Sequence, residues 1–265
     1  MKFADSHCHL DFPELASQLP ALLKQCQQAA INRIVIPTVD PDNWQRVLTL
    51  TSANQSHIEL YPALGIHPWY LQGLSESTLD QLESLIAAHK DQIIAVGEAG
   101  IDGTIAQKQK NLEQQILFFE RQLELANNYQ LPIIIHHRKS HAEIVQSLNR
   151  FPVEYGGIVH AFSGSYQQAK AYLDRGFKLG IGGTISYQRA KKTINTVKKL
   201  PLDSMVLETD APSMPLEGFQ GQANSPLKLK TIFELLCQLR EETPQDIADQ
   251  LWLNLNDVLR IKNTQ

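Results

Sequence analysis

The sequence contains only three cysteines among its 265 residues, and no two of them form a CxxC pair. Cys8, Cys26 and Cys237 are too few and too far apart for a disulfide framework or a cysteine-based zinc site. This usage is typical of a reducing compartment, so we predict a cytoplasmic protein. The first 20 residues carry several charged side chains, a pattern unlike the apolar segment of a signal peptide.

Long hydrophobic runs are also missing, because no segment reaches the roughly 20 apolar residues that a membrane-spanning helix requires. The chain has no excess of basic residues, since its formal net charge is −4 and its pI is about 6.1. These values exclude a general nucleic-acid coat and a polybasic membrane binder, but they allow a locally positive active-site mouth. No low-complexity stretch or Pro/Gly linker divides the sequence, so we predict one domain over residues 1–265.

Short β-branched runs alternate along the chain with segments in which apolar residues recur every three or four positions, as in helices. Eight such runs, each followed by a helical segment, favour an α/β fold of the (β/α)8 TIM-barrel type. A doubly wound sheet is the alternative, but no G-x-G-x-x-G motif follows the first run. We expect residues 243–261 to form two short helices against the barrel. The candidate strands are 3–10, 33–38, 58–66, 93–100, 132–137, 157–162, 177–183 and 204–211.

Ionisable side chains recur at or just beyond the carboxyl ends of these candidate strands. They are His7, His9, His67, Glu98, His136, His137, His160, Glu208 and Asp210. In a barrel these ends open onto one face, so residues distant in sequence become neighbours. Four histidines with a glutamate and an aspartate exceed the four ligands of a single tetrahedral zinc. They indicate two adjacent divalent cations bridged by a carboxylate.

Neighbouring side chains of a strand point to opposite faces, which selects the candidates that face the site. His7 and His9 share a face and can converge on one ion. Only one of His136 and His137 faces the barrel axis, and we expect it to be His136. Glu208 lies deeper than the last aspartate, and we expect it to support a ligand or, alternatively, to pair with a buried basic side chain.

The chain contains DSHCHLDFP, GIHPW, VGEAGID, PIIIHHR, GIVHAFSGS, GIGGTISY and LETDAP, in this order. These motifs resemble the TatD family of metal-dependent hydrolases and deoxyribonucleases, which belongs to the amidohydrolase superfamily. The resemblance extends over essentially the whole chain. The stretches GGTISYQRAKK and LETDAPSMPLEGFQGQ are most similar to the YjjV-type branch of the family.

The resemblance implies a TIM barrel with two divalent cations per subunit, for which Zn, Mn, Mg, Fe and Ni are all compatible with the ligands. The implied metal ligands are His7, His9, Glu98, His136, His160 and Asp210. Glu98 bridges the two cations, and Asp210 lies near the attacking water. We therefore predict Asp210 and Glu98 as catalytic residues.

The predicted chemistry is attack by a metal-activated water on a phosphodiester, with DNA or a small phosphoester as the substrate. His67, Arg138 and Ser163 are candidate substrate contacts. Their alternatives are a loop cap for His67, a salt bridge for Arg138 and a helix N-cap for the serine cluster that follows the sixth strand. Three basic residues at the predicted barrel mouth either contact phosphate or lie on a solvated helix face: Arg189, Lys191 and Lys192. We expect no membrane partner, and a monomer is compatible with the sequence.

Three loops depart from the better-known deoxyribonucleases of this family. Residues 103–105 replace an aromatic and a basic residue after GID, and Lys139 stands where an acidic residue is usual. The stretch GFQGQANSP replaces an arginine-rich segment. Two alternatives to a deoxyribonuclease therefore stay open. One is a metal-dependent hydrolase of small amide, ester or lactone substrates, and the other is a non-catalytic metal-binding protein.

Overall fold

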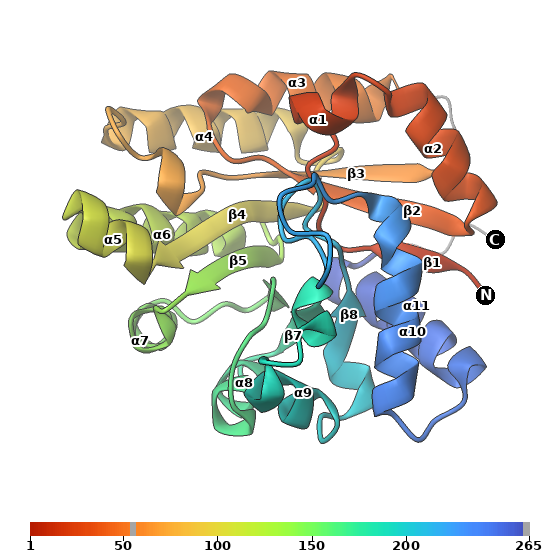
Figure 1. Cartoon of the computed structure of the whole chain (residues 1–265). Helices are drawn as coiled ribbons and strands as arrows, with labels where there is room; N and C mark the ends of the chain where they lie inside the picture. Colours follow the sequence, from red (N-terminus) through yellow and green to blue (C-terminus); the bar gives the residue numbers. More distant parts are fainter. Residues whose placement is uncertain (54–56, 262–265) are drawn as a thin grey trace.

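The computed structural model describes residues 1–53 and 57–261. Its strands form one parallel eight-stranded sheet in which the strand order follows the sequence (Figure 1). This arrangement confirms the predicted TIM-barrel fold. The strands are β1 (Phe3–Asp5), β2 (Ile31–Pro37), β3 (Glu59–Leu64), β4 (Ala95–Asp102), β5 (Ile133–Arg138), β6 (Gly157–Val159), β7 (Phe177–Ile181) and β8 (Met205–Leu207).

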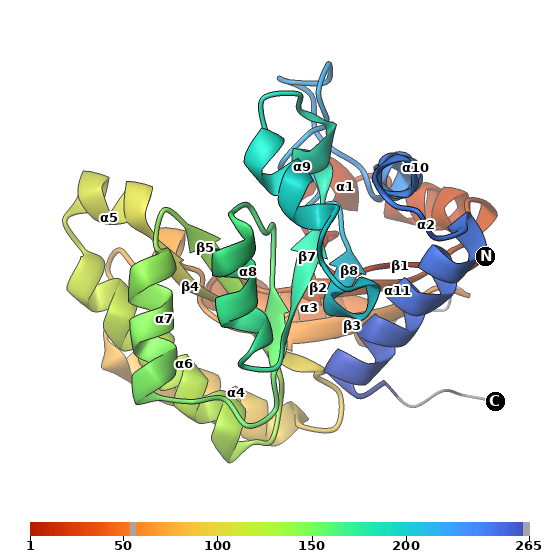
Figure 2. The ribbon, with the colours of Figure 1, turned by 90° about the horizontal axis from the view of Figure 1, so that it is seen from below.

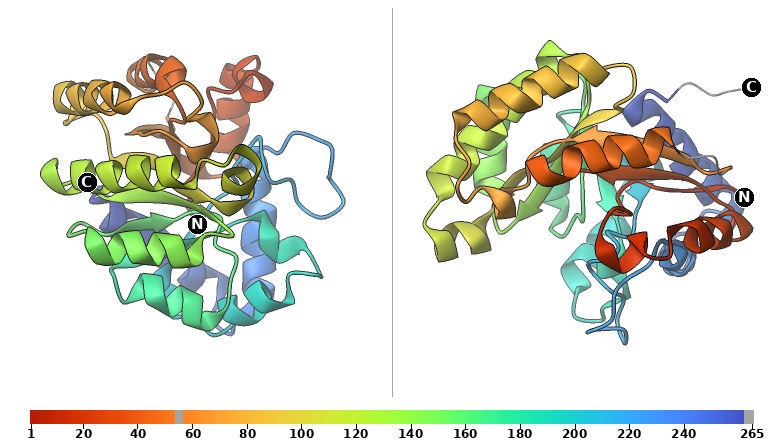
Figure 3. Two further views of the ribbon diagram at one scale, coloured as in Figure 1. Left: turned by 90° about the vertical axis from the view of Figure 1, so that its left-hand side faces the viewer. Right: turned by 90° about the horizontal axis from the view of Figure 1, so that it is seen from above.

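Helices surround the sheet, as the two views of Figure 3 show. The longer ones are α2 (Leu19–Gln28), α3 (Pro41–Ser52), α4 (Glu76–His89), α6 (Leu112–Asn128), α7 (His141–Arg150), α8 (Tyr166–Leu173), α10 (Leu229–Leu239) and α11 (Pro244–Leu259). The shorter ones are α1 (Pro13–Ala16), α5 (Gly103–Gln109) and α9 (Lys191–Val197). Single 3-10 turns are η1 (Pro68–Tyr70), η2 (Gly183–Ser186), η3 (Leu202–Ser204) and η4 (Pro226–Lys228).

The barrel closes between the segments that follow β1 and β8. The backbone N–H of Ser6 donates to Leu207 O at 2.9 Å, and Cys8 forms a parallel bridge with Ala211. The carboxylate of Asp5 strengthens this joint, because it accepts hydrogen bonds from both the backbone N–H and the hydroxyl of Thr209. The segments that carry His7 and Asp210 are thereby held side by side.

Alternate residues of the strands pack into two separate apolar regions. On β2, Val35 belongs to the cluster inside the barrel, whereas Ile34 and Ile36 pack against the helices. The positions inside the barrel and those that face the helices are both fully buried, which explains why the sequence of the strand is a continuous apolar run. Leu255 and Val258 of α11 join the inner cluster. This helix covers the end of the barrel at which the strands begin (Figure 2).

Five strands are shorter than predicted, namely β1, β3, β6, β7 and β8, and three of them are only three residues long. β1 ends at Asp5, β6 at Val159 and β8 at Leu207, so His7, His160 and their partners lie just beyond regular strand pairing. Regular strand pairing ends there, because each backbone group beyond it forms a hydrogen bond to a single neighbouring segment. The Cys8 N–H, for example, donates to Val35 O at 3.0 Å. The candidate ligands consequently lie in the loops that open the barrel.

The prediction of two short helices at 243–261 is wrong, because α11 is one continuous helix. Thr243 caps its start by accepting a hydrogen bond from the Asp246 N–H, and Pro244 occupies the first turn. Apolar residues then recur at helical spacing through to Leu259, and Arg260 ends the helix in a left-handed conformation. Among the described residues, no helix combines the length and apolar character that a bilayer-spanning segment requires.

Gly100 of β4 is required by the close approach of β5. Its φ is +153°, and a Cβ at this position would lie 2.0 Å from the carbonyl oxygen of His136. We predict that Gly100→Ala lowers the free energy of unfolding by about 3 kcal/mol, because the backbone contact leaves no flexible atom to move aside. Urea denaturation measures this loss.

Gly182→Ala is the matched control. A Cβ there would meet its nearest neighbours, which belong to Glu208, at 3.4 Å, an ordinary van der Waals distance. Equal unfolding free energies for the two variants would contradict the close approach of β4 and β5.

Candidate metal centre

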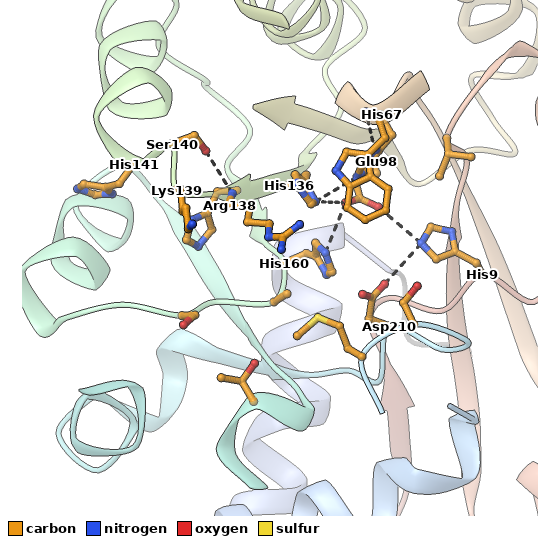
Figure 4. A pocket seen from close by; sticks show the side chains of 18 of the residues that line it. His9, His67, Glu98, His136, Arg138, Lys139, Ser140, His141, His160 and Asp210 are labelled. Carbon is orange, nitrogen blue, oxygen red and sulfur yellow. Dashed lines mark hydrogen bonds and ion pairs between the residues drawn. The ribbon is translucent and has the colours of Figure 1, made fainter. Parts of the chain in front are cut away.

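The structure brings the six predicted ligands together at the carboxyl end of the barrel. Figure 4 shows His9, Glu98, His136, His160 and Asp210 converging on one region of a cavity, with His67 beside them. His7 completes the group, with its Nε2 3.2 Å from that of His9. The cavity has a volume of about 660 Å³. Residues from both ends of the chain and from its middle therefore share a single site.

The two oxygens of Glu98 face different groups of side chains. Oε2 lies 2.9 Å from His7 Nε2 and 3.6 Å from His9 Nε2. Asp210 Oδ1 lies 3.6 and 3.5 Å from the same two nitrogens. These four residues form the first group of donor atoms.

The second group surrounds the other oxygen of Glu98. Oε1 lies 2.9 Å from His136 Nδ1 and 3.4 Å from His160 Nε2. His67 Nε2 lies 3.3 Å from the same oxygen. A carboxylate placed between two sets of imidazoles is the arrangement expected of a bridging ligand.

Hydrogen bonds behind the histidines assign their tautomers. A backbone carbonyl only accepts, so His9 Nδ1–H donates to Pro37 O at 3.2 Å, and His9 Nε2 carries a lone pair. His136 Nε2–H likewise donates to Asp102 Oδ2 at 3.2 Å, which leaves a lone pair on Nδ1. Both lone pairs point towards carboxylate oxygens and other imidazole nitrogens, and a cation between them removes the repulsion.

The donor distances fit metal ions. Ligands held about 2.1 Å from a tetrahedral or octahedral ion are about 3.0–3.4 Å apart. The distances within each group, 2.9 to 3.6 Å, lie close to this spacing. Imidazole and carboxylate ligands suit zinc, manganese, iron and nickel. The residues present therefore fit divalent cations.

The electrostatics of the cavity also favour added positive charge. In the described part of the chain, the ion-pair partners of Glu98 and Asp210 are histidines and not lysine or arginine. Burial disfavours a charged His160, but Glu98, Glu208 and Asp210 outweigh it and raise the pKa of this imidazole to about 10. Carboxylates that stabilise an imidazolium so strongly also stabilise a metal cation.

Glu208 lies behind His160, and among the described residues it forms no ion pair with lysine or arginine. Its Oε1 is 3.3 Å from His160 Nδ1 and accepts the backbone N–H of Ala161 at 2.5 Å. Gly180 makes room for it, since a Cβ there would lie 2.1 Å from Glu208 Oε2. This carboxylate orients His160 towards the centre.

His136 faces the centre, and its neighbour His137 packs near the rings of Phe162 and Tyr172. Burial lowers the pKa of His137 to about 3, so this imidazole is neutral. The alternation of side chains along β5 therefore separates the two histidines as predicted from the sequence.

His67 faces the centre as a hydrogen-bond donor. Its Nδ1 accepts the backbone N–H of Trp69 at 3.1 Å, so Nε2 carries the hydrogen and points at Glu98 and His136. Burial lowers the pKa of His67 to about 4, which keeps the ring neutral. His67 therefore fits both alternatives, because its Nδ1 caps the loop and its Nε2 faces the centre.

The other two candidate contacts also line the cavity. Arg138 is half exposed, and its Nη1 lies 3.8 Å from Asp102 Oδ2, so the guanidinium has both a salt bridge and access to substrate. Ser163 shares a hydrogen bond of 3.2 Å with the Thr193 hydroxyl. The helix N-cap is Ser165 instead, whose hydroxyl oxygen accepts from the Gln168 N–H.

Asp102 is a residue that the sequence reasoning missed. Its Oδ2 accepts hydrogen bonds from Trp69 Nε1 at 2.7 Å and from His136 Nε2, while Oδ1 caps α5. Burial favours the neutral form, but His136 and Trp69 outweigh it and hold the pKa of this carboxyl below its usual range. Asp102 ends β4 four residues after Glu98, and this shared parity is a signal that could have identified it.

Comparisons with known proteins agree with this geometry. The sequence matches the family described as TatD related DNase over residues 4–260. The chain belongs to the TatD family. It is 42% identical to the "Uncharacterized metal-dependent hydrolase YjjV" of Escherichia coli (strain K12), over 96% of each chain. The crystal structure of that YjjV, described as a TatD homolog, superposes with a TM-score of 0.93 at 41% identity, over 98% of each chain.

A more distant relative carries a nuclease name. The "3'-5' ssDNA/RNA exonuclease TatD" of Erwinia billingiae is 26% identical, over 97% of this chain and 98% of its own. Family membership makes this protein a metal-dependent hydrolase. Among the described residues, three groups could hold a metal ion: His7 with His160 and Asp210, His7 with His9 and Glu98, and His67 with Glu98 and His136.

Removing the first histidine pair tests the ligand set. We predict that the double variant His7→Ala/His9→Ala loses about one metal equivalent per chain after reconstitution with Mn²⁺ or Zn²⁺, because no other imidazole replaces these donors. Elemental analysis by mass spectrometry measures the loss. His57→Ala, an exposed histidine, is the control. Unchanged metal content in the double variant would contradict the assignment.

Replacing Asp102 tests its effect on His136. In Asp102→Asn, the amide N–H₂ group faces two hydrogen-bond donors when it is turned towards Trp69 and His136. The His136 ring must then change tautomer or move. We expect metal affinity to fall about 10- to 100-fold, as for other carboxylates that orient metal-bound histidines. Calorimetric titration measures the affinity. Asp40→Asn, at the N-cap of α3, is the matched control and should bind metal normally.

Proposed function

We propose that this hydrolase is a phosphodiesterase that cleaves nucleic acid, DNA in the first instance, at a centre of two divalent cations. The observation that carries the proposal is the position of Glu98, whose Oε2 lies nearest His7 and whose Oε1 lies nearest His136. Two-cation centres suit in-line displacement at phosphorus, because both the attacking and the leaving oxygen gain stabilisation. The nuclease name of the Erwinia relative supports the same substrate class.

The cations, when bound, lower the pKa of a coordinated water and polarise a phosphoryl oxygen. Asp210 is placed to orient that water and take its proton, since its carboxylate reaches the cavity and lies beside His7 and His9. A carboxylate in this position acts as a general base. His9 and His136 hold fixed orientations through hydrogen bonds to Pro37 O and Asp102, so the reacting groups need little rearrangement. Glu208 Oε1 lies 3.3 Å behind His160 Nδ1.

Two side chains are placed to hold the substrate. His67 Nε2–H points into the centre and can donate to a phosphoryl or leaving-group oxygen. Arg138 lines the cavity with an exposed guanidinium, whose planar fork suits a phosphate. Together they place one neutral donor and one fixed positive charge around the scissile group.

A hydrolase of small amide, ester or lactone substrates is the second candidate. The observation that favours it is the size of the cavity, about 660 Å³, which accommodates a small molecule. The long segment after β8, residues 213–224, also carries no arginine or lysine at the mouth. The same cations would polarise a carbonyl oxygen in place of a phosphoryl oxygen.

Cleavage of end-labelled oligonucleotides tests the proposal. We predict that the protein loaded with Mn²⁺ or Zn²⁺ shortens single-stranded DNA and that Asp210→Asn lowers kcat by about 100-fold or more, since a general base contributes that much. Denaturing gels with fluorescent DNA and RNA measure both rates. His57→Ala is again the control.

Hydrolysis of a small ester or lactone by protein that leaves DNA and RNA intact would replace the proposal with the second candidate. Full metal content with no turnover of any of these substrates would instead favour a non-catalytic metal-binding protein.

A further inference from the structure

Two large aromatic side chains remain exposed beside the candidate metal centre. Trp69 and Tyr70 belong to η1, immediately after His67, and have 44% and 38% of their surface exposed. Both line the cavity, as does Phe12 from the loop after β1. Exposed aromatic surface at the mouth of a site is typical of ligand binding, because a protein gains no stability from leaving it in water.

The Trp69 ring is held in place by its own hydrogen bonds. The indole Nε1–H donates to the buried carboxylate of Asp102, and the backbone N–H donates to His67 Nδ1. The ring also stands edge-on to the imidazole of His67, with centroids 5.4 Å apart and an interplanar angle of 85°. The polar atom of the indole is thus satisfied within the protein, and the exposed surface is a fixed apolar face. A rigid face binds a flat ligand at little cost in conformational entropy.

The exposed face of Trp69 lies close to the candidate metal centre. The Trp69 ring centroid is 6.4 Å from that of His136, which contributes to the second donor group. A base joined through its sugar to a phosphate at the centre can therefore reach the indole. Nucleobases stack on aromatic side chains irrespective of sequence, since each base presents a π face.

The rest of the cavity wall has the complementary chemistry. Arg138 ends β5, Lys139 follows it, and Lys192 lies in the first turn of α9; all three line the same cavity. Arg138 Nη1 lies 3.8 Å from Asp102 Oδ2, the oxygen that accepts the hydrogen bond from Trp69 Nε1, so positive charge lies beside the indole. Figure 4 shows Arg138 and Lys139 side by side near the centre. The cavity thus offers a flat apolar surface with positive charge beside it, which suits the base and the phosphates of a nucleotide chain.

We propose that Trp69 stacks against the nucleobase next to the scissile phosphate, and that this contact makes the site selective for base-bearing phosphodiesters. The inference rests on the proposed function, but it assigns a specificity-determining residue that contributes no donor atom to the metal centre. It also assigns places within the cavity, with the base on the Trp69 face and the phosphates near Arg138, Lys139 and Lys192.

The test compares Trp69→Leu with Trp69→Phe. Both substitutions remove the Nε1–H that donates to Asp102, but only phenylalanine keeps an aromatic face. The substrates are two single-stranded oligonucleotides that differ at the terminal residue, which carries either a normal base or an abasic tetrahydrofuran. Dissociation constants are measured by fluorescence anisotropy with the metal chelated, and KM and kcat with the metal-loaded protein.

We expect Trp69→Leu to weaken binding of the base-bearing oligonucleotide roughly 5- to 100-fold, the range for loss of one base–aromatic stack. Binding of the abasic oligonucleotide should change about twofold or less. Trp69→Phe should retain most of the wild-type affinity. Equal loss in the leucine and phenylalanine variants would overturn the proposal, because the Asp102 hydrogen bond would then explain the effect. Equal loss for the two oligonucleotides would overturn it as well.

Intrinsic fluorescence separates failure of this inference from failure of the proposed function. Adding a mononucleotide to the chelated protein should quench the Trp69 emission, and the quenching should disappear in Trp69→Phe. Trp252→Phe is the matched control, since Trp252 lies on α11 near Arg33, away from the cavity. Quenching without hydrolysis would support the stacking site and reject the nuclease. Hydrolysis of oligonucleotides without any base dependence would support the nuclease and reject the stacking site.

Discussion

One buried carboxylate organises this molecule. Glu98 is 2% exposed and lies within 3.6 Å of ring nitrogens from five histidines, which are His7, His9, His67, His136 and His160. A charge taken out of water at this depth is costly unless cations or donors surround it. The five imidazoles come from loops or strands that are far apart along the chain. A closed barrel is what brings such residues to one point, so the fold and the centre are a single constraint.

The second layer explains why the imidazoles point inwards. Pro37 O, Asp102 and Glu208 lie behind His9, His136 and His160. Pro37 and Asp102 end strands that neighbour those of His9 and His136, and Glu208 follows β8, two strands from β6 and His160, so barrel pairing sets ring orientation. A shift of one strand by a residue would reverse the faces of its side chains and break this layer.

Two features could be predicted from the sequence because they depend on local periodicity. They are the alternation of strands and helices and the strand face on which each histidine lies. The faces of His7 and His9 were correct although β1 ends at Asp5, since the chain stays extended through the bridge to Ala211. Asp102 shares its parity with Glu98, but its hydrogen bonds could not be predicted from local periodicity, because its partners Trp69 and His136 come from η1 and β5. The continuity of α11 was missed for a similar reason, as packing against the barrel floor stabilises it.

The centre and the cavity wall are physically connected. Asp102 accepts hydrogen bonds from both Trp69 at the rim and His136 in the centre, so the indole and the imidazole share one carboxylate. Loss of the indole N–H leaves that carboxylate with one donor fewer and frees it to move, and His136 can move with it. A substitution of Trp69 that changes substrate preference therefore also affects the orientation of His136. A rim residue that cannot donate to Asp102 alters the group that orients His136, even where it fits a new substrate better.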